Sequence, residues 1–216
     1  MNNFLPKDIL FMKSFGIIIL IAIIAVFAYF GLKGSGAKSN TNNNTDTNTA
    51  DNNIKKETGM KLEFPGILAE DKINNKKAVL ETGKGKIEFE LYADSAPKTV
   101  SNFVYLAEKG FYDGLTFHRV VPGFVIQGGD PEGTGSGGPG YQFEDEKVQG
   151  DYKAGTVAMA NSGPDTNGSQ FFICLDDQPT LPKQYNLFGQ VTVGMDVVKN
   201  IAVGDKINSI KIENIK

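Results

Sequence analysis

Three reactive residue types each occur once in the chain of 216 residues: Arg119, His118 and Cys174. A guanidinium stays charged at physiological pH and presents five N–H donors in a rigid fork. Arg119 stands inside the run FHRVVPGFVIQGGD at 117–130, in which most neighbouring side chains are apolar. A sheltered cation beside hydrophobic surface is typical of a binding site. The alternative is a solvated charge at the edge of a strand.

Other chemistries fit these residues less well. Cys174 lies in the apolar run FFICL at 171–175, which indicates a buried thiol and not a nucleophile. The loop GTGSGGPG at 133–140 lacks the Gly-Lys-Ser/Thr ending of a phosphate loop, and Pro139 interrupts any helix after it. A single cysteine and a single histidine exclude cysteine-based zinc clusters and multi-histidine metal sites. No nucleophile-elbow pattern supports hydrolysis.

Charge also restricts the possible partners. The chain has 22 Lys+Arg, 25 Asp+Glu and a net charge of −3. This balance gives no electrostatic reason to expect nucleic-acid binding.

The elements that must position Arg119 belong to residues 60–216. Alternating or short apolar runs separated by glycine- and proline-rich loops predict several strands. Ser95 and Pro97 begin a predicted helix that ends at Gly110, and a second helix is expected over 195–201. This pattern predicts a mainly β domain, a closed antiparallel barrel with two helical caps. The predicted strands cover 78–82, 86–92, 117–126, 155–160, 170–175, 187–193 and the region from Ile207 to Ile212, with an irregularity before Ile210.

The N-terminal region has a different character. Between Lys13 and Lys33 lie 19 uncharged, mostly apolar residues, 14–32. As a helix they would span about 28 Å, close to the ~30 Å of a bilayer core. We expect a transmembrane signal anchor, with the short segment 1–13 in the cytoplasm because Lys7 and Lys13 precede the apolar run. A cleaved signal peptide and a secreted domain are the alternative.

Residues 33–59 are rich in asparagine and threonine and contain almost no large apolar side chain. Such a segment buries too little surface to offset its chain entropy, so we predict a disordered, flexible linker. The expected protein is therefore a single-pass cell-membrane protein with a folded extracytoplasmic domain at 60–216.

Three motifs carry a family resemblance. FHRVVPGFVIQGGD at 117–130, MANSGPDTNGSQFFI at 159–173 and FGQV at 188–191 together resemble the cyclophilin family of peptidyl-prolyl isomerases. The resemblance covers roughly residues 75–215, and the segments GTGSGGPGY and LPKQYNLFG are similar to the bacterial single-domain branch. It implies an eight-stranded closed barrel capped by two helices.

The resemblance also implies roles for particular residues. Arg119 matches the catalytic arginine, and Phe124 matches part of the catalytic set. Gln127 matches the glutamine that hydrogen-bonds the substrate and helps to orient the arginine. No metal or cofactor is implied. The implied substrate-binding residues are Val125, Phe172 and Leu181 in the proline pocket, Ala160 and Asn161 beside the substrate backbone, Gln170 on the neighbouring wall, Tyr185 at the rim and His118 in support.

The implied activity is rotation of X–Pro peptide bonds in proline-containing client polypeptides, by a protein expected to be monomeric. A proline-binding module, or a tethered chaperone without significant turnover, is the alternative. Weak cyclosporin binding at best is expected, because the chain has no tryptophan and carries Thr180 near that position. Val125 and Tyr185 also stand where the family commonly has methionine and histidine.

Overall fold

A computed structural model describes residues 62–215 of the chain. The predicted cytoplasmic segment 1–13, the anchor 14–32 and the linker 33–59 all lie outside the described residues. Within 62–215, no helix is long and apolar enough to cross a membrane.

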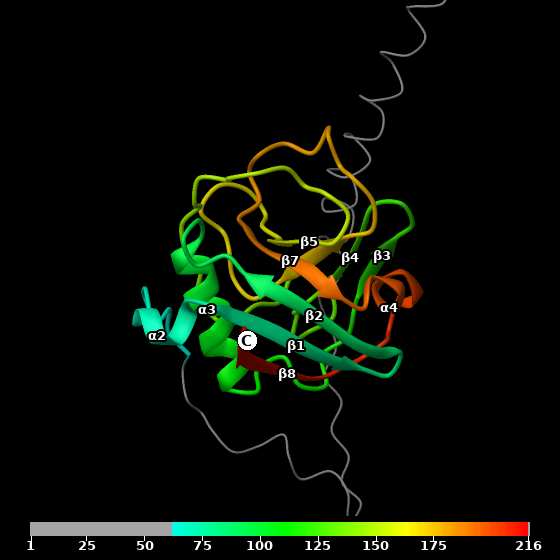
Figure 1. Cartoon of the computed structure of the whole chain (residues 1–216), viewed down its shortest axis with the longest axis horizontal. Helices are drawn as coiled ribbons and strands as arrows, with labels where there is room; N and C mark the ends of the chain where they lie inside the picture. Colours follow the sequence, from blue (N-terminus) through cyan, green and yellow to red (C-terminus); the bar gives the residue numbers. More distant parts are fainter. Residues whose placement is uncertain (1–61, 216) are drawn as a thin grey trace, which may run out of the picture. The chain divides into compact units, whose positions relative to one another are not determined.

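Eight strands form one antiparallel sheet in the order β3-β4-β6-β5-β7-β2-β1-β8. The runs of alternating apolar residues become these strands because each has one face toward a common interior. Figure 1 shows β8, β1 and β2 side by side at one part of the curled sheet. The strands are β1 (Lys76–Thr82), β2 (Gly85–Leu91), β3 (Arg119–Val121), β4 (Val125–Gly128), β5 (Thr156–Met159), β6 (Phe171–Cys174), β7 (Leu187–Val193) and β8 (Ile207–Asn214).

The edges of this sheet, β3 and β8, are joined by the segments that precede them. The backbone N–H of Gly114 donates to the carbonyl of Ile207 at 2.7 Å, and Phe117 donates to Asp205 at 2.9 Å. No ladder pairs β3 with β8 among the described residues. The prediction of eight antiparallel strands is confirmed, but the expected closed barrel is a curled sheet whose edges meet over this short stretch.

Both predicted helices are present. The helix α3 (Pro97–Glu108) has its proline in the first turn and is followed by Gly110 at φ 66°, and α4 (Met195–Asn200) follows β7. The short helix α2 (Glu70–Ile73) was not predicted. Its four residues are too few to show a helical period.

The predicted strand 117–126 is divided into β3 and β4. Pro122 has no N–H to donate to a ladder, and Gly123 adopts φ 72°, so the chain turns back here. The N–H of Phe124 donates to the carbonyl of Val121 at 3.0 Å and closes the turn. The predicted irregularity in the last strand is confirmed, because the pairing of β1 with β8 shifts register at Thr82 and Ile207.

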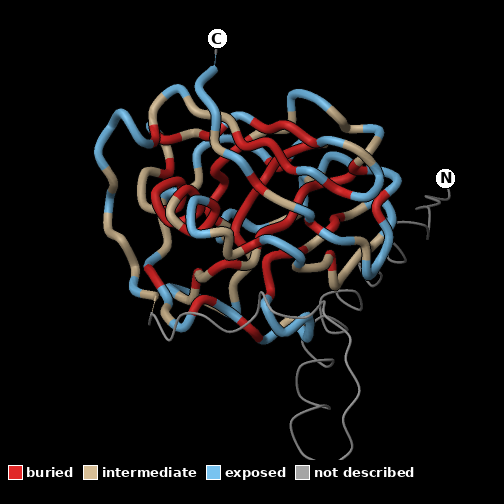
Figure 2. The backbone as a smooth tube through the Cα atoms, turned by 90° about the horizontal axis from the view of Figure 1, so that it is seen from below, coloured by how far each residue is buried: buried red, intermediate tan, exposed pale blue. Residues whose placement is uncertain are grey.

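The main core fills the inside of the curled sheet and is covered by α3. The rings of Phe103 on α3 and Phe171 on β6 meet edge to face with centroids 5.7 Å apart, and Phe188 lies 5.2 Å from Phe103. All three are fully buried. Figure 2 shows buried backbone in the interior and exposed backbone mainly in the surrounding loops.

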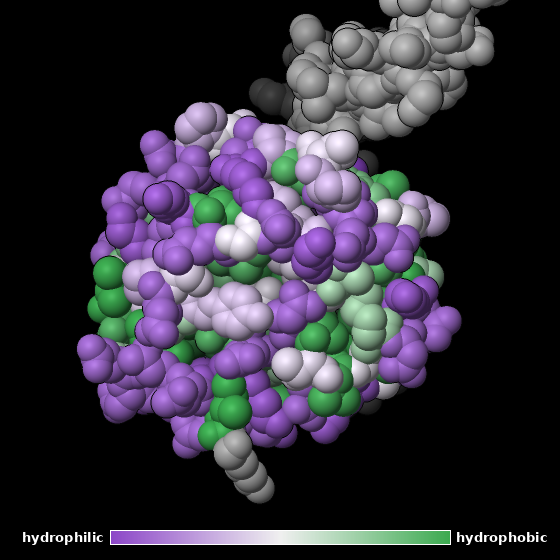
Figure 3. All heavy atoms as spheres, turned by 45° about the horizontal axis from the view of Figure 1, so that its top comes forward, coloured by the Kyte–Doolittle hydropathy of each residue, from purple (hydrophilic) through white to green (hydrophobic). Residues whose placement is uncertain are grey.

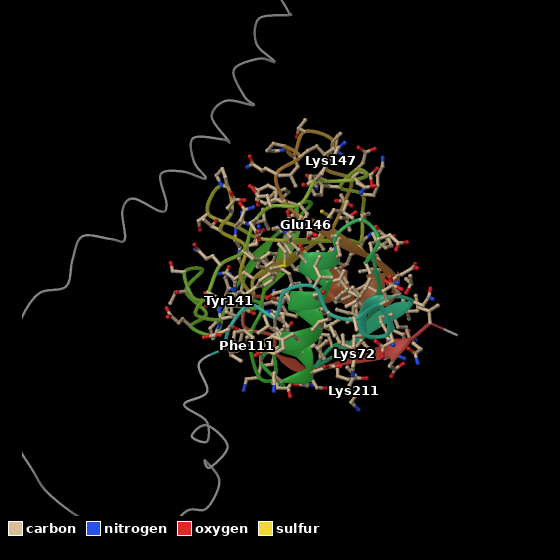
Figure 4. The ribbon with its side chains drawn as sticks, turned by 90° about the vertical axis from the view of Figure 1, so that its left-hand side faces the viewer. Lys72, Phe111, Tyr141, Glu146, Lys147 and Lys211 are labelled. Carbon is tan, nitrogen blue, oxygen red and sulfur yellow. The ribbon has the colours of Figure 1, made fainter. Side chains whose placement is uncertain are left out.

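A segment before β1, residues 62–73, packs against α3, and we call it the strap. Phe64 stacks on Phe143 with ring centroids 5.0 Å apart and planes 9° apart, and Tyr141 lies 6.1 Å from Phe64. The N–H of Leu68 donates to Ser101 Oγ of α3 at 2.9 Å. Figure 4 labels Tyr141 beside α3 and Glu146 at one end of that helix. The strap is therefore part of the folded unit.

Candidate active site

Strand pairing places two predicted catalytic residues, Arg119 and Gln127, and the predicted substrate-binding residue Phe172 together on the outer face of the sheet. Arg119 on β3 pairs with Gln127 on β4, Gln127 pairs with Phe172 on β6, and Phe172 pairs with Ala158 on β5. These four residues form one row across four strands. Neighbouring residues in a strand face opposite sides of the sheet. The residue directly before Gln127, Ile126, therefore points to the main core.

The apolar part of this face is a second hydrophobic cluster, separate from the main core. Phe172 and Val125 are buried in it, at 5% and 2% exposure, while Phe171 belongs to the main core. The assignment of Phe172 to the substrate face is thus matched by its separation from Phe171. The cluster consists of Val125, Tyr152, Ala158, Phe172, Cys174 and Leu187, with Tyr92, Phe124, Val148, Ala160, Leu181 and Tyr185 packed against it.

A chain of side-chain amides orients the guanidinium. Arg119 Nη1 donates to Gln127 Oε1 at 3.1 Å, and Gln127 Nε2 donates to Gln170 Oε1 at 2.9 Å. Gln170 Nε2 in turn donates to the carbonyl of Gly137 at 2.9 Å. Both amides are fixed at both ends, so the oxygen of Gln127 points toward Arg119 and the oxygen of Gln170 points toward Gln127. The glycine-rich loop 133–140 therefore supports the site through Gly137.

Arg119 is half-buried and carries its charge against an aromatic ring. Its Cζ lies 5.7 Å from the centroid of the Phe124 ring, within the range of a cation–π contact. Burial lowers the pKa of Arg119, and Tyr185 opposes that shift. Among residues 62–215 no carboxylate lies within 4.0 Å of the guanidinium. The charge is thus uncompensated by an acid and can act on a ligand carbonyl or nitrogen.

Tyr185 and Leu181 form another wall of the cluster. The Tyr185 ring meets Phe172 edge to face at 5.6 Å. The hydroxyl of Tyr152 donates to the carbonyl of Tyr185 at 2.8 Å and accepts from the N–H of Tyr185 at 3.0 Å. These two bonds fix the backbone of Tyr185, so Tyr152 is a supporting residue that the sequence reasoning missed. Its only sequence signal is an isolated aromatic residue in a polar loop.

Ala160 and Asn161 continue from β5 along the same face. The N–H of Ala160 donates to the carbonyl of Gln170 at 2.9 Å. Asn161 Nδ2 donates to the carbonyl of Gln184 at 2.9 Å, which ties this segment to the residue before Tyr185. Asn161 therefore joins two walls of the site with its side chain, and its backbone remains the part predicted to pair with substrate.

His118 is not joined to the amide chain. Both of its ring nitrogens are buried and have no hydrogen-bond partner among the described residues. Burial lowers the pKa of His118, although the nearby carboxylate of Asp130 opposes the shift. A neutral, unpartnered ring of this kind can support the strand but offers no proton relay to Arg119.

Cys174 behaves as predicted for a structural thiol. It is fully buried in the second cluster, and burial raises its pKa to about 12. A thiol with so high a pKa is protonated and unreactive at neutral pH. In the described part of the chain no group of three or more His, Cys, Asp or Glu side chains could hold a metal ion.

Residues 77–216 match the family "Cyclophilin type peptidyl-prolyl cis-trans isomerase/CLD". Peptidyl-prolyl cis-trans isomerase B of Bacillus subtilis is 53% identical over 137 residues, which cover 62% of this chain and 95% of the relative. A peptidyl-prolyl cis-trans isomerase of Synechococcus elongatus is 51% identical over 138 residues, or 63% of this chain and 95% of the relative.

The fold agrees with that match. The crystal structure of a cyclophilin-type isomerase of Cryptosporidium parvum superimposes with a TM-score of 0.61 at 35% identity, covering 64% of this chain and 98% of that one. A second structure of the same protein, in the presence of the dipeptide Ala-Pro, gives 0.60, also at 35% identity, and covers 64% of this chain and 99% of that one. The family match extends over more than half of the chain and includes every residue of the site above. The chain is therefore a member of the cyclophilin-type peptidyl-prolyl cis-trans isomerase family.

Proposed function

We propose that this isomerase accelerates X–Pro bond rotation by hydrogen bonds from Arg119 to the twisted amide. The observation that carries the proposal is the half-buried guanidinium, bonded to Gln127 at 3.1 Å and resting on Phe124 beside the apolar cluster. Such an arrangement puts a fixed donor next to a surface on which a proline ring can pack.

The reaction requires no bond to another group. Amide resonance sets a barrier of ~18–20 kcal/mol to rotation. In the twisted state the prolyl nitrogen becomes pyramidal and carries a lone pair that can accept a hydrogen bond. Arg119 donates to this nitrogen as the lone pair develops, and a preorganised donor of this kind contributes about 3–4 kcal/mol.

The remaining residues hold the substrate while one part of it rotates. Phe172, Val125 and Leu181 bind the proline ring by apolar contact, and the backbone at Ala160 and Asn161 binds the peptide on one side. Gln127 holds the guanidinium in place and contacts the substrate. The substrates proposed are proline-containing polypeptides, consistent with the Ala-Pro dipeptide named for the Cryptosporidium parvum structure.

A protease-coupled assay on a proline tetrapeptide tests the role of Arg119. The variant Arg119→Ala is expected to lose at least about tenfold in kcat/KM. Arg119→Lys keeps the charge but lacks the planar fork of N–H donors. Its kcat/KM should therefore be closer to that of Arg119→Ala than to that of the parent chain. Circular dichroism checks folding in each case. A folded Arg119→Ala variant with parental activity contradicts the mechanism, and a folded but inactive parent chain would favour a proline-binding module or chaperone.

We also propose that residues 14–32 anchor the domain to a bacterial cell membrane, with 60–216 outside the cytoplasm. The support is the uncharged apolar segment and the polar linker after it. We further propose that the domain binds cyclosporin weakly at best, because the chain contains no tryptophan. Thr180 is exposed and cannot supply the aromatic surface of a tryptophan.

A further inference from the structure

Gln178 lies outside the residues assigned to the site, in the loop between β6 and β7. Its side chain is half-buried, and Nε2 donates to the carbonyl of Gly123 at 2.8 Å and to that of Asp176 at 3.2 Å. Gly123 belongs to the turn between β3 and β4, and the next residue is Phe124. The amide of Gln178 therefore fastens the turn that carries the ring beneath Arg119.

The tip of the turn depends on such bonds because it is not packed against the domain. Pro122 and Gly123 are both exposed, and Gly123 has a positive φ of 72°. The Gly123 carbonyl shares its peptide group with the N–H of Phe124, which donates to the carbonyl of Val121, and the carbonyl of Phe124 accepts from the N–H of Leu175. Loss of the Gln178 amide would leave the peptide group directly before Phe124 held only through its N–H.

The backbone of Gln178 reaches the wall formed by Tyr185 and Leu181 at two points. Its N–H donates to the carbonyl of Tyr152 at 2.8 Å, and Tyr152 holds Tyr185. Its carbonyl accepts from the N–H of Leu181 at 3.2 Å. One residue thus connects the Phe124 turn, the tyrosine pair and the Leu181 wall, although it touches none of the reacting atoms.

We propose that Gln178 is a positioning residue of the isomerase, whose side-chain amide sets the place of Phe124 and, through it, the guanidinium of Arg119. The proposal rests on the catalytic role proposed for Arg119. Its effect should appear mainly in kcat, because the Leu181 and Tyr152 bonds use the backbone of Gln178 and persist when the side chain changes.

The test is the variant Gln178→Met in the full chain, with the same detergent in every sample. Methionine keeps the length of the side chain but cannot donate. We expect kcat to fall about three- to tenfold with KM within about twofold, since small displacements of a catalytic group are costly. Because Arg119 is the only arginine, its Nε–Hε signal in a ¹⁵N–¹H spectrum is unambiguous and should shift.

Gln142→Met is the matched control, because Gln142 is exposed and belongs to neither the site nor the turn. It should leave kcat and the Arg119 signal unchanged. A folded Gln178→Met variant with an unmoved Arg119 signal overturns the proposal, whether or not activity falls. If that variant does not fold, Gln178→Glu decides by the same two readouts, since its carboxylate also cannot donate.

The two proposals fail in different ways. If Arg119→Ala retains parental activity, the catalytic role of Arg119 is wrong, while the Arg119 signal of Gln178→Met still reports whether the turn is held by this amide.

Discussion

At the scale of single residues, the site links the guanidinium of Arg119 to a hydrogen-bonded chain of neutral amides. Gln127, Gln170 and the carbonyl of Gly137 orient Arg119 without placing a carboxylate beside it. A carboxylate would neutralise the guanidinium and compete with the substrate for its donors. Neutral amides give the same directional control and leave the charge available to the twisted peptide bond.

His118 gives a prediction about pH. Burial, with a contribution from Arg119, lowers its pKa from the ordinary 6.5, so the unfolded chain binds more protons than the folded one as pH falls through that value. Stability should therefore begin to decrease as the pH falls below about 6.5, above the range where carboxylates titrate. Because His118 is the only histidine, His118→Gln should flatten this part of the profile of thermal midpoint against pH. An equally steep decrease in that variant would contradict the prediction.

Much of the site could be predicted from the sequence, except for the residues that act through contacts between loops. The family resemblance assigns Arg119, Gln127 and Phe172 to the site, and the strand pairing places them in one row. Alternation within β6 predicts only that one of Phe171 and Phe172 faces the core. Tyr152 and Gln178 could not be found in this way. They act through hydrogen bonds between loops, and nothing in a loop sequence states which other loop it will meet.

At the scale of elements, two contacts hold the strap to residues far away in sequence, one in a loop and one on α3. Phe64 stacks on Phe143, and Leu68 bonds to Ser101. The family match begins at residue 77, so the strap lies before the matched part of the chain. Its short helix α2 could not be predicted because four residues carry no periodicity, and its position depends on α3.

The strap should contribute measurably to stability. Phe64→Ala removes the stacked ring and is expected to lower the free energy of unfolding by about 1–2 kcal/mol, less than for a fully buried phenylalanine. Urea denaturation followed by circular dichroism measures the effect. Ile67→Ala is the control from the same segment, since Ile67 is 58% exposed and should change little. Equal effects of the two changes would mean that the strap is not held by the Phe64 stack.

The N-terminus of α3 is held by a carboxylate from a distant loop. Glu146 accepts hydrogen bonds from the backbone N–H groups of Lys98 and Thr99, each at 2.9 Å. Asn186, next to Tyr185, donates to the hydroxyl of Thr99 at 3.0 Å. The main covering helix and the tyrosine wall of the site are thus fastened to each other, a connection that the helix sequence alone, with Ser95 and Pro97, does not reveal.

At the scale of the whole domain, one curled sheet serves two purposes. Its inner face contributes the main core. Its outer face carries the second cluster and the row formed by Arg119, Gln127, Phe172 and Ala158. Figure 3 shows that hydrophilic side chains cover much of the face in view, with apolar side chains in separate patches. Every residue of the site lies within residues 77–216, the part matched to the family.

Catalysis should accordingly be independent of the N-terminal region. On a soluble tetrapeptide, residues 60–216 should have the kcat/KM of the full chain within about twofold, because the rate is set by groups within the domain. In membrane fractions, the full chain should resist alkaline extraction and a chain lacking 14–32 should be released. Release of both forms would exclude the anchor and leave the enzymatic proposal unaffected.

The two adjacent phenylalanines of β6 have a consequence for folding. If β6 slipped by one residue against β4 and β5, Phe172 and Cys174 would enter the interior and Phe171 and Ile173 would face outward. The strand is buried and apolar on both faces, so its own hydrophobicity hardly penalises the error. Only the correct register aligns Phe172 with Gln127. Recovery of isomerase activity during refolding therefore reports when β6 has found its register, an event to which far-ultraviolet circular dichroism is nearly blind.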